Sequence, residues 1–177
     1  MNRDPLANPE PLIRRVYSYV AYRIGDGPDA EDVTSDAIER AIRYRNRFDP
    51  RKGKPQTWLI GIARHCVDDY LREHVMHVAE LPEQPELRQL EHDAVLRLTV
   101  AAAVAALEPH DRDLVALRYG AEMSSRQIGR LLDMEPNAVD VALHRARARL
   151  RTHLESRGLR GRSSTTPRPD PAVESPL

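Results

Sequence analysis

The chain has 177 residues, a formal net charge of zero and a single cysteine, Cys66. One cysteine excludes an internal disulfide framework and fits a reducing compartment. No apolar run is long enough to span a bilayer, and the first residues lack the apolar segment of a signal peptide. We therefore expect a cytoplasmic protein that is not inserted in a membrane.

The charges are distributed unevenly along the chain. Residues 76–108 carry six acidic side chains against two basic ones, whereas residues 142–162 carry seven arginines against one glutamate. This polarity is typical of a protein with a basic surface for nucleic acid and an acidic strip elsewhere.

The apolar residues of the first half recur at helical spacing, without the period-two alternation of a strand. One stripe runs from Leu12 to Ile24, and a second runs from Ala30 to Ile42, with Asp29 placed to cap its start. A third runs from Thr57 to Leu71, after the loop "NRFDPRKGKP". We expect these three helices to form a domain over residues 9–73.

The second half begins after an acidic segment, residues 74–86, which two prolines interrupt and which we interpret as a linker. Helices are predicted at about 87–107 and 111–119, followed by a helix pair, and together they form a domain over residues 87–155. Residues 156–177 are rich in Pro, Ser and Thr and are predicted to be a disordered tail. The prediction is an all-α fold of two small helical domains joined by a flexible linker.

The helix pair at residues 124–150 has the pattern of a helix-turn-helix. Ser124 and Gln127 form a capping box at the start of the first helix. Asp133 stands where that helix must stop, because aspartate tolerates the left-handed conformation, and Pro136 fits the first turn of the next helix.

The second helix of the pair has a candidate DNA-reading face. Its apolar side is predicted to be formed by Val139, Leu143, Ala146 and Leu150. The opposite face carries Asn137, Val141, His144 and Arg145. Asparagine can pair with adenine in a major groove, valine can touch a thymine methyl group, and arginine can hold phosphate or guanine. An ordinary helical hairpin with a solvated basic face is the alternative.

Both halves resemble parts of one family. The stretch "AEDVTSDAIERAIRYRNRF…GKPQTWLIGIARHCVDDYLR" resembles the core-binding and promoter-melting domain of sigma-70-type bacterial initiation factors. The stretch "LEPHDRDLVALRYGAEMSSRQIGRLLDMEPNAVDVALHRARARLR" resembles their C-terminal domain, which reads the −35 promoter element. The order of the two and the absence of a middle domain are similar to the extracytoplasmic-function (ECF) group. The resemblance covers roughly residues 10–73 and 90–152.

The resemblance implies that the second helix docks on core RNA polymerase, and an anti-sigma factor is a further candidate partner. The expected docking face has mixed charge, which suits an electrostatically matched partner, although the same face could simply be solvated. The family usually has Gln-Glu and Trp where this chain has Ser35-Asp36 and Ile42. The candidate docking residues are Asp32, Ser35, Asp36, Glu39, Arg40 and Arg43.

The resemblance also implies that the third helix and the loop before it recognise the −10 element as an extruded single-strand base. Capture of a single strand needs a basic groove and stacking surfaces. Phe48 could stack on a flipped base or could anchor the loop to the core, and Trp58 is expected in the core. His65 stands where the family usually has Asn. The candidate −10 residues are Arg47, Phe48, Arg51, Lys52, Lys54, Arg64 and His65.

The −35 face departs from the family at the positions of Asp140 and Ala142, where cations are common, and we expect this loss to weaken phosphate contacts. The candidate −35 residues are Ser125, Arg126, Asn137, Asp140, Val141, His144 and Arg145.

Other functions find little support in the sequence. Cys66, His74 and His77 come closest to a zinc site, but no second cysteine exists. Nucleotide-binding loops and a nucleophile elbow are not found, so we predict no catalytic residues, no metal and no cofactor. The rival interpretation is a stand-alone helix-turn-helix regulator whose first half is a dimerisation or effector domain. Such a regulator would bind duplex DNA on its own.

Overall fold

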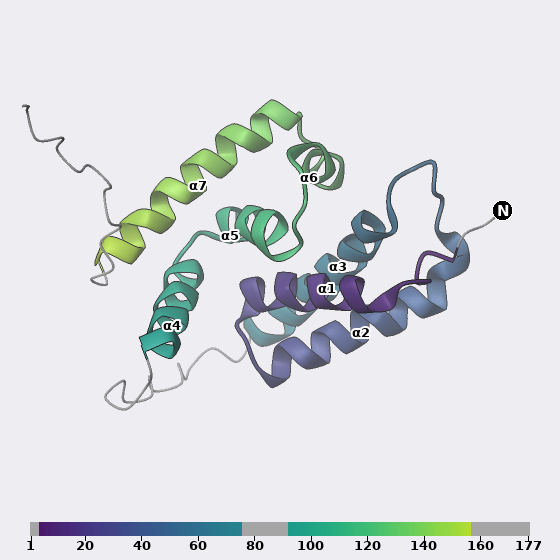
Figure 1. The fold of residues 1–177 in the computed structure, drawn as a ribbon, viewed down its shortest axis with the longest axis horizontal. Coiled ribbons are helices and arrows are strands. Elements are labelled where there is room, and N and C mark those ends of the chain that lie inside the picture. Colours follow the sequence, from purple (N-terminus) through teal and green to yellow (C-terminus); the bar gives the residue numbers. More distant parts are fainter. Residues whose placement is uncertain (1–3, 76–91, 157–177) are drawn as a thin grey trace, which may run out of the picture.

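The computed structural model describes residues 4–75 and 92–156 (Figure 1). These residues form helices and connecting turns without a β-strand, which confirms the all-α prediction. No helix among them is long and apolar enough to cross a membrane.

The first half consists of α1 (Pro9–Ile24), α2 (Pro28–Tyr44), the short 3-10 turn η1 (Arg45–Arg47) and α3 (Pro55–Val75). Proline opens α1, α2 and α3, because the first turn of a helix needs no amide donor. Each helix buries its apolar stripe, with Val16, Ala37 and Val67 fully covered. The three predicted helices are therefore confirmed.

The predicted cap of α2 was wrong. The helix begins at Pro28, so Gly27 occupies the capping position and no side chain caps the helix. Asp29 lies inside the first turn and instead accepts a hydrogen bond of 2.6 Å from the Tyr70 hydroxyl of α3. Burial and this bond raise the pKa of Tyr70 to about 12.

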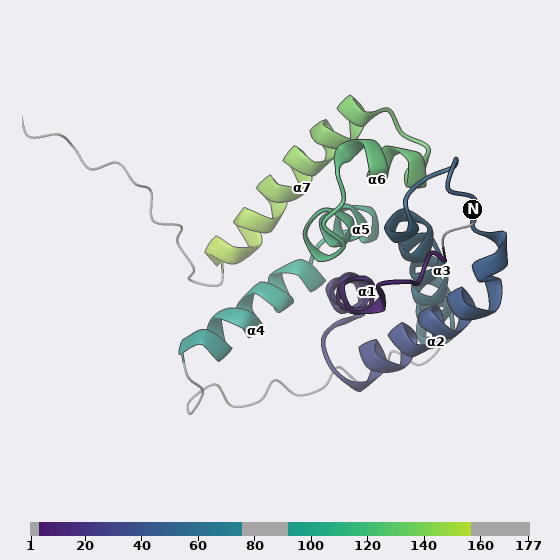
Figure 2. The same cartoon turned by 45° about the vertical axis from the view of Figure 1, so that its right-hand side comes forward.

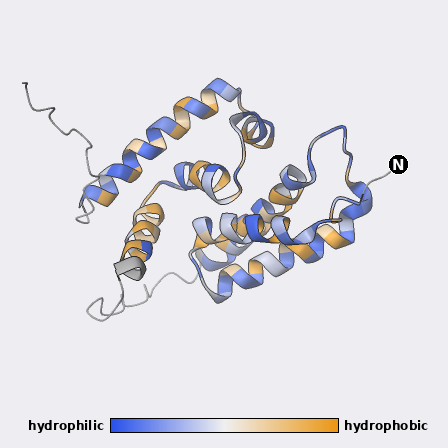
Figure 3. Cartoon of the chain, viewed as in Figure 1, coloured by the Kyte–Doolittle hydropathy of each residue, from blue (hydrophilic) through white to orange (hydrophobic). Residues whose placement is uncertain are grey.

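The second half consists of α4 (His92–Ala105), α5 (Pro109–Val115), the π-helical turn η3 (Ala116–Gly120), α6 (Ser125–Leu132) and α7 (Pro136–Ser156). The helices α6 and α7 form the predicted helix-turn-helix. In Figure 3, α7 is mostly hydrophilic with few apolar bands, whereas α4 is largely apolar.

The two halves share one large hydrophobic core, and a smaller separate cluster contains Leu107, Val115 and Ala146 of the second half. Val16 and Tyr19 of α1 belong to the same buried cluster as Leu117 of η3, Ile128 of α6 and Met123, which lies between these two elements. In Figure 2, α1 is seen end-on between α5 and α2, and it contacts α3, α4 and η3 as well. The helix-turn-helix half is thus packed directly on α1 and α3.

Two predicted segments fall largely on residues that are not described. The predicted linker, residues 74–86, lies outside the described residues from residue 76 onward, and α3 continues to Val75. The predicted tail, residues 156–177, lies outside them after Ser156, where α7 ends.

Candidate nucleic-acid interface

The turn between α6 and α7 is fixed by local bonds. Ser124 accepts the amide of Gln127, and the Gln127 side chain in turn accepts the amide of Ser124, so the predicted capping box is confirmed. Asp133 adopts the left-handed conformation (φ 54°, ψ 48°), as predicted. Gly129 allows the following turn to pass close to α6, because a Cβ there would lie 2.4 Å from the carbonyl oxygen of Met134.

The recognition helix α7 presents the predicted face to solvent. Val139, Leu143 and Ala146 are buried against α5 and α6, which fixes the orientation of the helix. On the opposite side of the helix, the apolar side chain of Val141 is 51% exposed. Asn137, His144 and Arg145 are exposed beside it, as is Arg126 on α6. An exposed row of an amide, a methyl-bearing side chain and a cation can contact base edges and phosphates in a groove.

Asp140, on the same face, is engaged by a cation from another element. Its carboxylate accepts a hydrogen bond from Ser125 and lies 3.5 Å from Nη2 of Arg118. Arg118 belongs to η3, and it also donates to the Met123 carbonyl oxygen at 3.1 Å and to the Ser125 hydroxyl at 2.5 Å. Arg118 was missed in the sequence, because 22 residues separate it from Asp140 and no local pattern links them.

Phe48 lies in the interior of the basic loop. It is only 7% exposed, and its ring centroid lies 5.5 Å from that of Trp58 at an interplanar angle of 59°. This tilted packing is what the anchoring alternative requires, and it leaves little of the ring for stacking on a base. Arg47 lies over the Tyr44 ring at 4.9 Å, which gives the loop an exposed cation–aromatic pair.

The other predicted −10 residues lie on the loop before α3 and on α3 itself. Arg51, Lys52 and Lys54 are exposed on the loop, where Arg51 pairs with Asp49 and lowers the pKa of that carboxyl group. His65 is exposed on α3. Arg64 instead donates to Asp113 of the second half at 2.9 Å. The structure therefore separates Arg64 from the loop cations rather than gathering all seven residues in one groove.

The predicted docking face of α2 is exposed over most of its length. Asp32, Ser35, Asp36 and Glu39 are all exposed, and Arg43 pairs with Glu39 at 2.5 Å. Arg40 turns toward α3 and forms an ion pair with Asp69 at 3.1 Å, which lowers the pKa of Asp69. Ile42 adds an apolar patch that is 52% exposed. The face therefore offers acidic, basic and apolar contacts to a partner.

A buried polar network joins the two halves, and no pattern in the sequence predicted it. Asp113 of α5 is 4% exposed and accepts hydrogen bonds from the Tyr19 hydroxyl at 2.8 Å and from Arg23 at 2.6 Å. Its other oxygen accepts the bond from Arg64, and Arg23 also reaches Asp68 at 3.3 Å. Burial and the charge of Asp113 raise the pKa of Tyr19 well above its ordinary value, so the phenol remains a donor.

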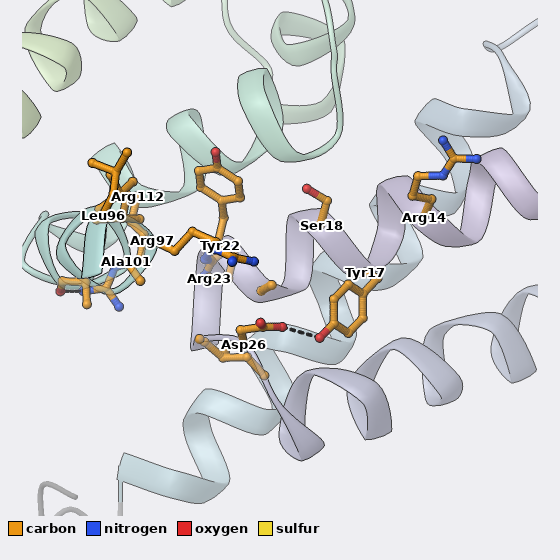
Figure 4. A pocket seen from close by; sticks show the side chains of 16 residues that line it. Arg14, Tyr17, Ser18, Tyr22, Arg23, Asp26, Leu96, Arg97, Ala101 and Arg112 are labelled. Atoms are coloured by element: carbon orange, nitrogen blue, oxygen red, sulfur yellow. Dashed lines mark hydrogen bonds between the residues drawn. The ribbon is translucent and has the colours of Figure 1, made fainter. Parts of the chain in front are cut away.

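A groove of about 640 Å³ separates α1 from α4 (Figure 4). Leu96 and Ala101 of α4 line it on one side, and it is also lined by four arginines: Arg14, Arg23, Arg97 and Arg112. The buried Nε of Arg112 has no hydrogen-bond partner within the described residues, and burial together with the nearby Arg23 lowers the pKa of Arg112. An apolar groove bordered by several cations suits an amphipathic segment that carries carboxylates.

The fold and this surface define the class of this protein. It is a helix-turn-helix protein in which the helix-turn-helix follows a three-helix domain. Family models describe both parts, as sigma-70 region 2 over residues 10–75 and sigma-70 region 4 over residues 97–150. Among characterised relatives, the ECF RNA polymerase sigma factor ShbA of Streptomyces griseus is 30% identical over 86% of this chain and 86% of its own. The chain therefore belongs to the sigma-70 family of RNA polymerase sigma factors, in its ECF group.

Other relatives and two solved structures agree with this family. The ECF sigma factors BldN of Streptomyces coelicolor and SigE of Mycolicibacterium smegmatis are 30% and 31% identical over 74% and 79% of this chain. The chain spans 53% of the length of BldN and 57% of the length of SigE, little more than half of each.

The fold is shared with RpoE of Bartonella quintana, solved with the anti-sigma factor NepR (TM-score 0.67, 16% identity, covering 82% of this chain and 93% of that one). It is also shared with CnrH, solved with the cytosolic domain of CnrY (TM-score 0.61, 22% identity, 85% of both chains).

Proposed function

We propose that this chain is a sigma factor that binds core RNA polymerase, directs it to −35 and −10 promoter elements and promotes DNA melting. The observation that carries the proposal is the exposed face of α7, with Asn137, Val141 and Arg145 in a row on a fixed helix-turn-helix, in a chain of this family. Acting with polymerase, it would work in the cytoplasm, and the catalysis would belong to the polymerase rather than to this chain.

Each part of the proposed function has its own surface. The exposed mixed-charge face of α2 would dock on the polymerase. The exposed cations Arg51, Lys52 and Lys54 would hold the single strand near −10, and His65 would contribute to the base preference there. The face of α7 would read −35 in a major groove.

Mixing the purified chain with bacterial core polymerase tests the proposal. We expect the two to elute together in size-exclusion chromatography and the mixture to transcribe from a subset of a promoter library. A stand-alone regulator gives the opposite result: it binds duplex DNA tightly without polymerase, as a dimer on paired half-sites. Core polymerase alone, at the same concentration, is the control for transcription that does not depend on the chain.

We also propose an anti-sigma factor as a partner, because the solved neighbour RpoE was captured with one and this chain has the groove between α1 and α4. Leu96, 42% exposed on the groove wall, offers a test. Leu96→Asp should weaken a complex with an anti-sigma factor co-expressed with this chain, while binding to core polymerase stays unchanged. A complex of undiminished affinity would place the anti-sigma factor elsewhere.

A further inference from the structure

We propose that Asp140 of α7 reads a cytosine in the −35 element, through the carboxylate oxygen that its neighbours in the fold leave free. This assignment rests on the proposed function, because it names a base contact of the helix that is proposed to enter the major groove. It makes the acid a specificity-determining residue of this chain, at a position where a cation is common in the family.

Asp140 stands on the exposed side of α7, close to the start of the helix. The helix begins at Pro136, and Val139 and Leu143 are buried on its other side. Asn137 and Val141 are exposed on the same side as Asp140, because residues three and four positions apart share a helical face. Helix-turn-helix proteins contact base edges with the N-terminal residues of their second helix. A side chain at position 140 is therefore placed to meet bases as well as the DNA backbone.

The two carboxylate oxygens of Asp140 have different surroundings. Oδ1 accepts a hydrogen bond from the Ser125 hydroxyl and lies 3.5 Å from Nη2 of Arg118. Oδ2 has no hydrogen-bond partner among the residues that the structure describes, and the Asp140 side chain is 60% exposed. An ionised carboxylate has acceptor sites only. Asp140 therefore offers one free acceptor to the groove while its other oxygen is held.

The carboxylate is positioned by hydrogen bonds that begin outside α7. Arg118 donates to the Met123 carbonyl oxygen at 3.1 Å, which anchors its guanidinium, and to the Ser125 hydroxyl at 2.5 Å. Because this hydroxyl accepts from Arg118, its own proton is directed toward Asp140. The charge of Arg118 beside Oδ1 also reduces the repulsion between the carboxylate and DNA phosphates. The arrangement therefore lets an oriented acid approach a base edge.

Cytosine is the base that suits this acceptor best. In the major groove only cytosine and adenine present an amino donor, whereas guanine and thymine present O6, N7 or O4 acceptors that a carboxylate cannot bond. Adenine places its N7 acceptor beside its amino group, where it would face the carboxylate unfavourably, and cytosine has no acceptor on that edge. We therefore expect one cytosine of the −35 element to lie opposite Oδ2.

A change of base preference tests this contact. Holoenzyme binding to a −35 library that carries all four bases at each position gives the preference of each variant. We expect the unaltered chain to prefer cytosine at one position by about fivefold or more, and Asp140→Ala to lose that preference while keeping the others. Asp140→Asn should move the preference at this position from cytosine to adenine, because an amide can pair with both N6 and N7 of adenine.

Glu155→Gln is the matched control, because it removes the same charge from the same helix. Glu155 is exposed about four turns further along α7, so this variant should keep the cytosine preference. If Asp140→Asn instead raises the affinity for every sequence and leaves the base preferences unchanged, Asp140 only repels the DNA backbone and the cytosine contact is wrong. If the unaltered holoenzyme distinguishes no −35 bases at all, the proposed function fails together with the contact.

Ser125 provides a second measurement, because it positions the carboxylate without being the group that contacts cytosine. Ser125→Ala removes the donor to Oδ1 and should reduce the cytosine preference severalfold without a shift to another base. Ser125→Thr restores a hydroxyl and should recover most of the preference, which a general loss of stability would not allow. Circular dichroism compares the helicity of the variants. A cytosine preference that is unchanged in Ser125→Ala would contradict this positioning.

Discussion

The polar and apolar side chains on the outer face of α7 fall into two groups. Some are exposed and are expected to read DNA, and one is held in place by residues of other elements. Asn137, Val141 and Arg145 are exposed, whereas Asp140 is held by Ser125 and Arg118. The sequence suggested that Asp140 simply removes a phosphate-binding cation from this face. The structure adds that Arg118 of η3 places a cation 3.5 Å from the Asp140 carboxylate, which partly restores the balance of charge on this face.

Replacing Arg118 by Gln should therefore expose the charge of Asp140. The unpaired carboxylate would repel phosphates whatever the base sequence, so we expect the holoenzyme to bind all −35 variants more weakly, by about 1 kcal/mol or roughly fivefold. Adding Asp140→Asn should recover most of the loss, because it removes the repulsion. Binding of the four proteins to a −35 library, as a double-mutant cycle, measures this, and additive effects would contradict the pairing.

Substitutions of Asn137 and Arg145 should affect DNA binding in different ways. Asn137 lies near the start of α7, where helix-turn-helix proteins contact base edges, so Asn137→Ala should cost roughly 1–3 kcal/mol on the preferred −35 sequence and little on others. Arg145 is expected to hold phosphate, so Arg145→Ala should weaken all sequences alike and lower the salt slope by about one unit. Holoenzyme binding to the −35 library at several salt concentrations separates them, and the reverse pattern would mean that the two roles are exchanged.

At the scale of elements, helix positions could be predicted well because their signals are local. Apolar stripes, prolines at first turns and the capping box at Ser124 all lie within a few residues of the helices that they define. Asp29 shows the limit, because it was predicted as the cap of α2, whereas the helix starts at Pro28 and the capping position, Gly27, lies two residues earlier. Phe48 could not be decided from sequence, since its burial depends on Trp58 of the next helix.

The turn of the helix-turn-helix should tolerate no side chain at Gly129. A Cβ there would lie 2.4 Å from the Met134 carbonyl oxygen, so Gly129→Ala must displace backbone and should destabilise the fold by about 1–3 kcal/mol. Gly53→Ala is the control, because nothing lies within 4 Å of a Cβ at that position. Denaturant unfolding followed by circular dichroism compares the two, and an equal midpoint for both variants would show that the turn is not as close as described.

The proposed docking role of α2 can be tested at one of its exposed acids. Asp36 is exposed, whereas Arg40 is paired with Asp69 of α3, so Asp36→Lys changes the surface with less effect on the packing of α2. We expect about tenfold weaker binding to core polymerase with unchanged helicity, since a charge is reversed opposite a matched surface. Glu73→Lys, an exposed acid at the far end of α3, is the control. An affinity for core equal to that of the unaltered chain would remove α2 from the docking surface.

For the whole molecule, the sequence indicated two helical halves but not their contact. Asp113 lies 90 residues from Arg23 and 49 from Arg64, and these three charges look like ordinary surface residues until the fold brings them together. Gly120 likewise reads as a turn residue, although its role is to let η3 approach α1. Long-range polar networks leave no periodic pattern in a sequence, so only the structure could reveal this contact.

We propose that this chain makes core polymerase open promoter DNA. Permanganate oxidises unpaired thymines, so it tests that claim directly on a promoter selected from the transcription library. We predict reactive thymines around −10 only when both the chain and core polymerase are present, and less reactivity when Lys52 and Lys54, both exposed on the basic loop, are replaced by Ala. Thymines that stay unreactive with both present, while the chain alone protects duplex DNA, would contradict the account and favour a stand-alone regulator.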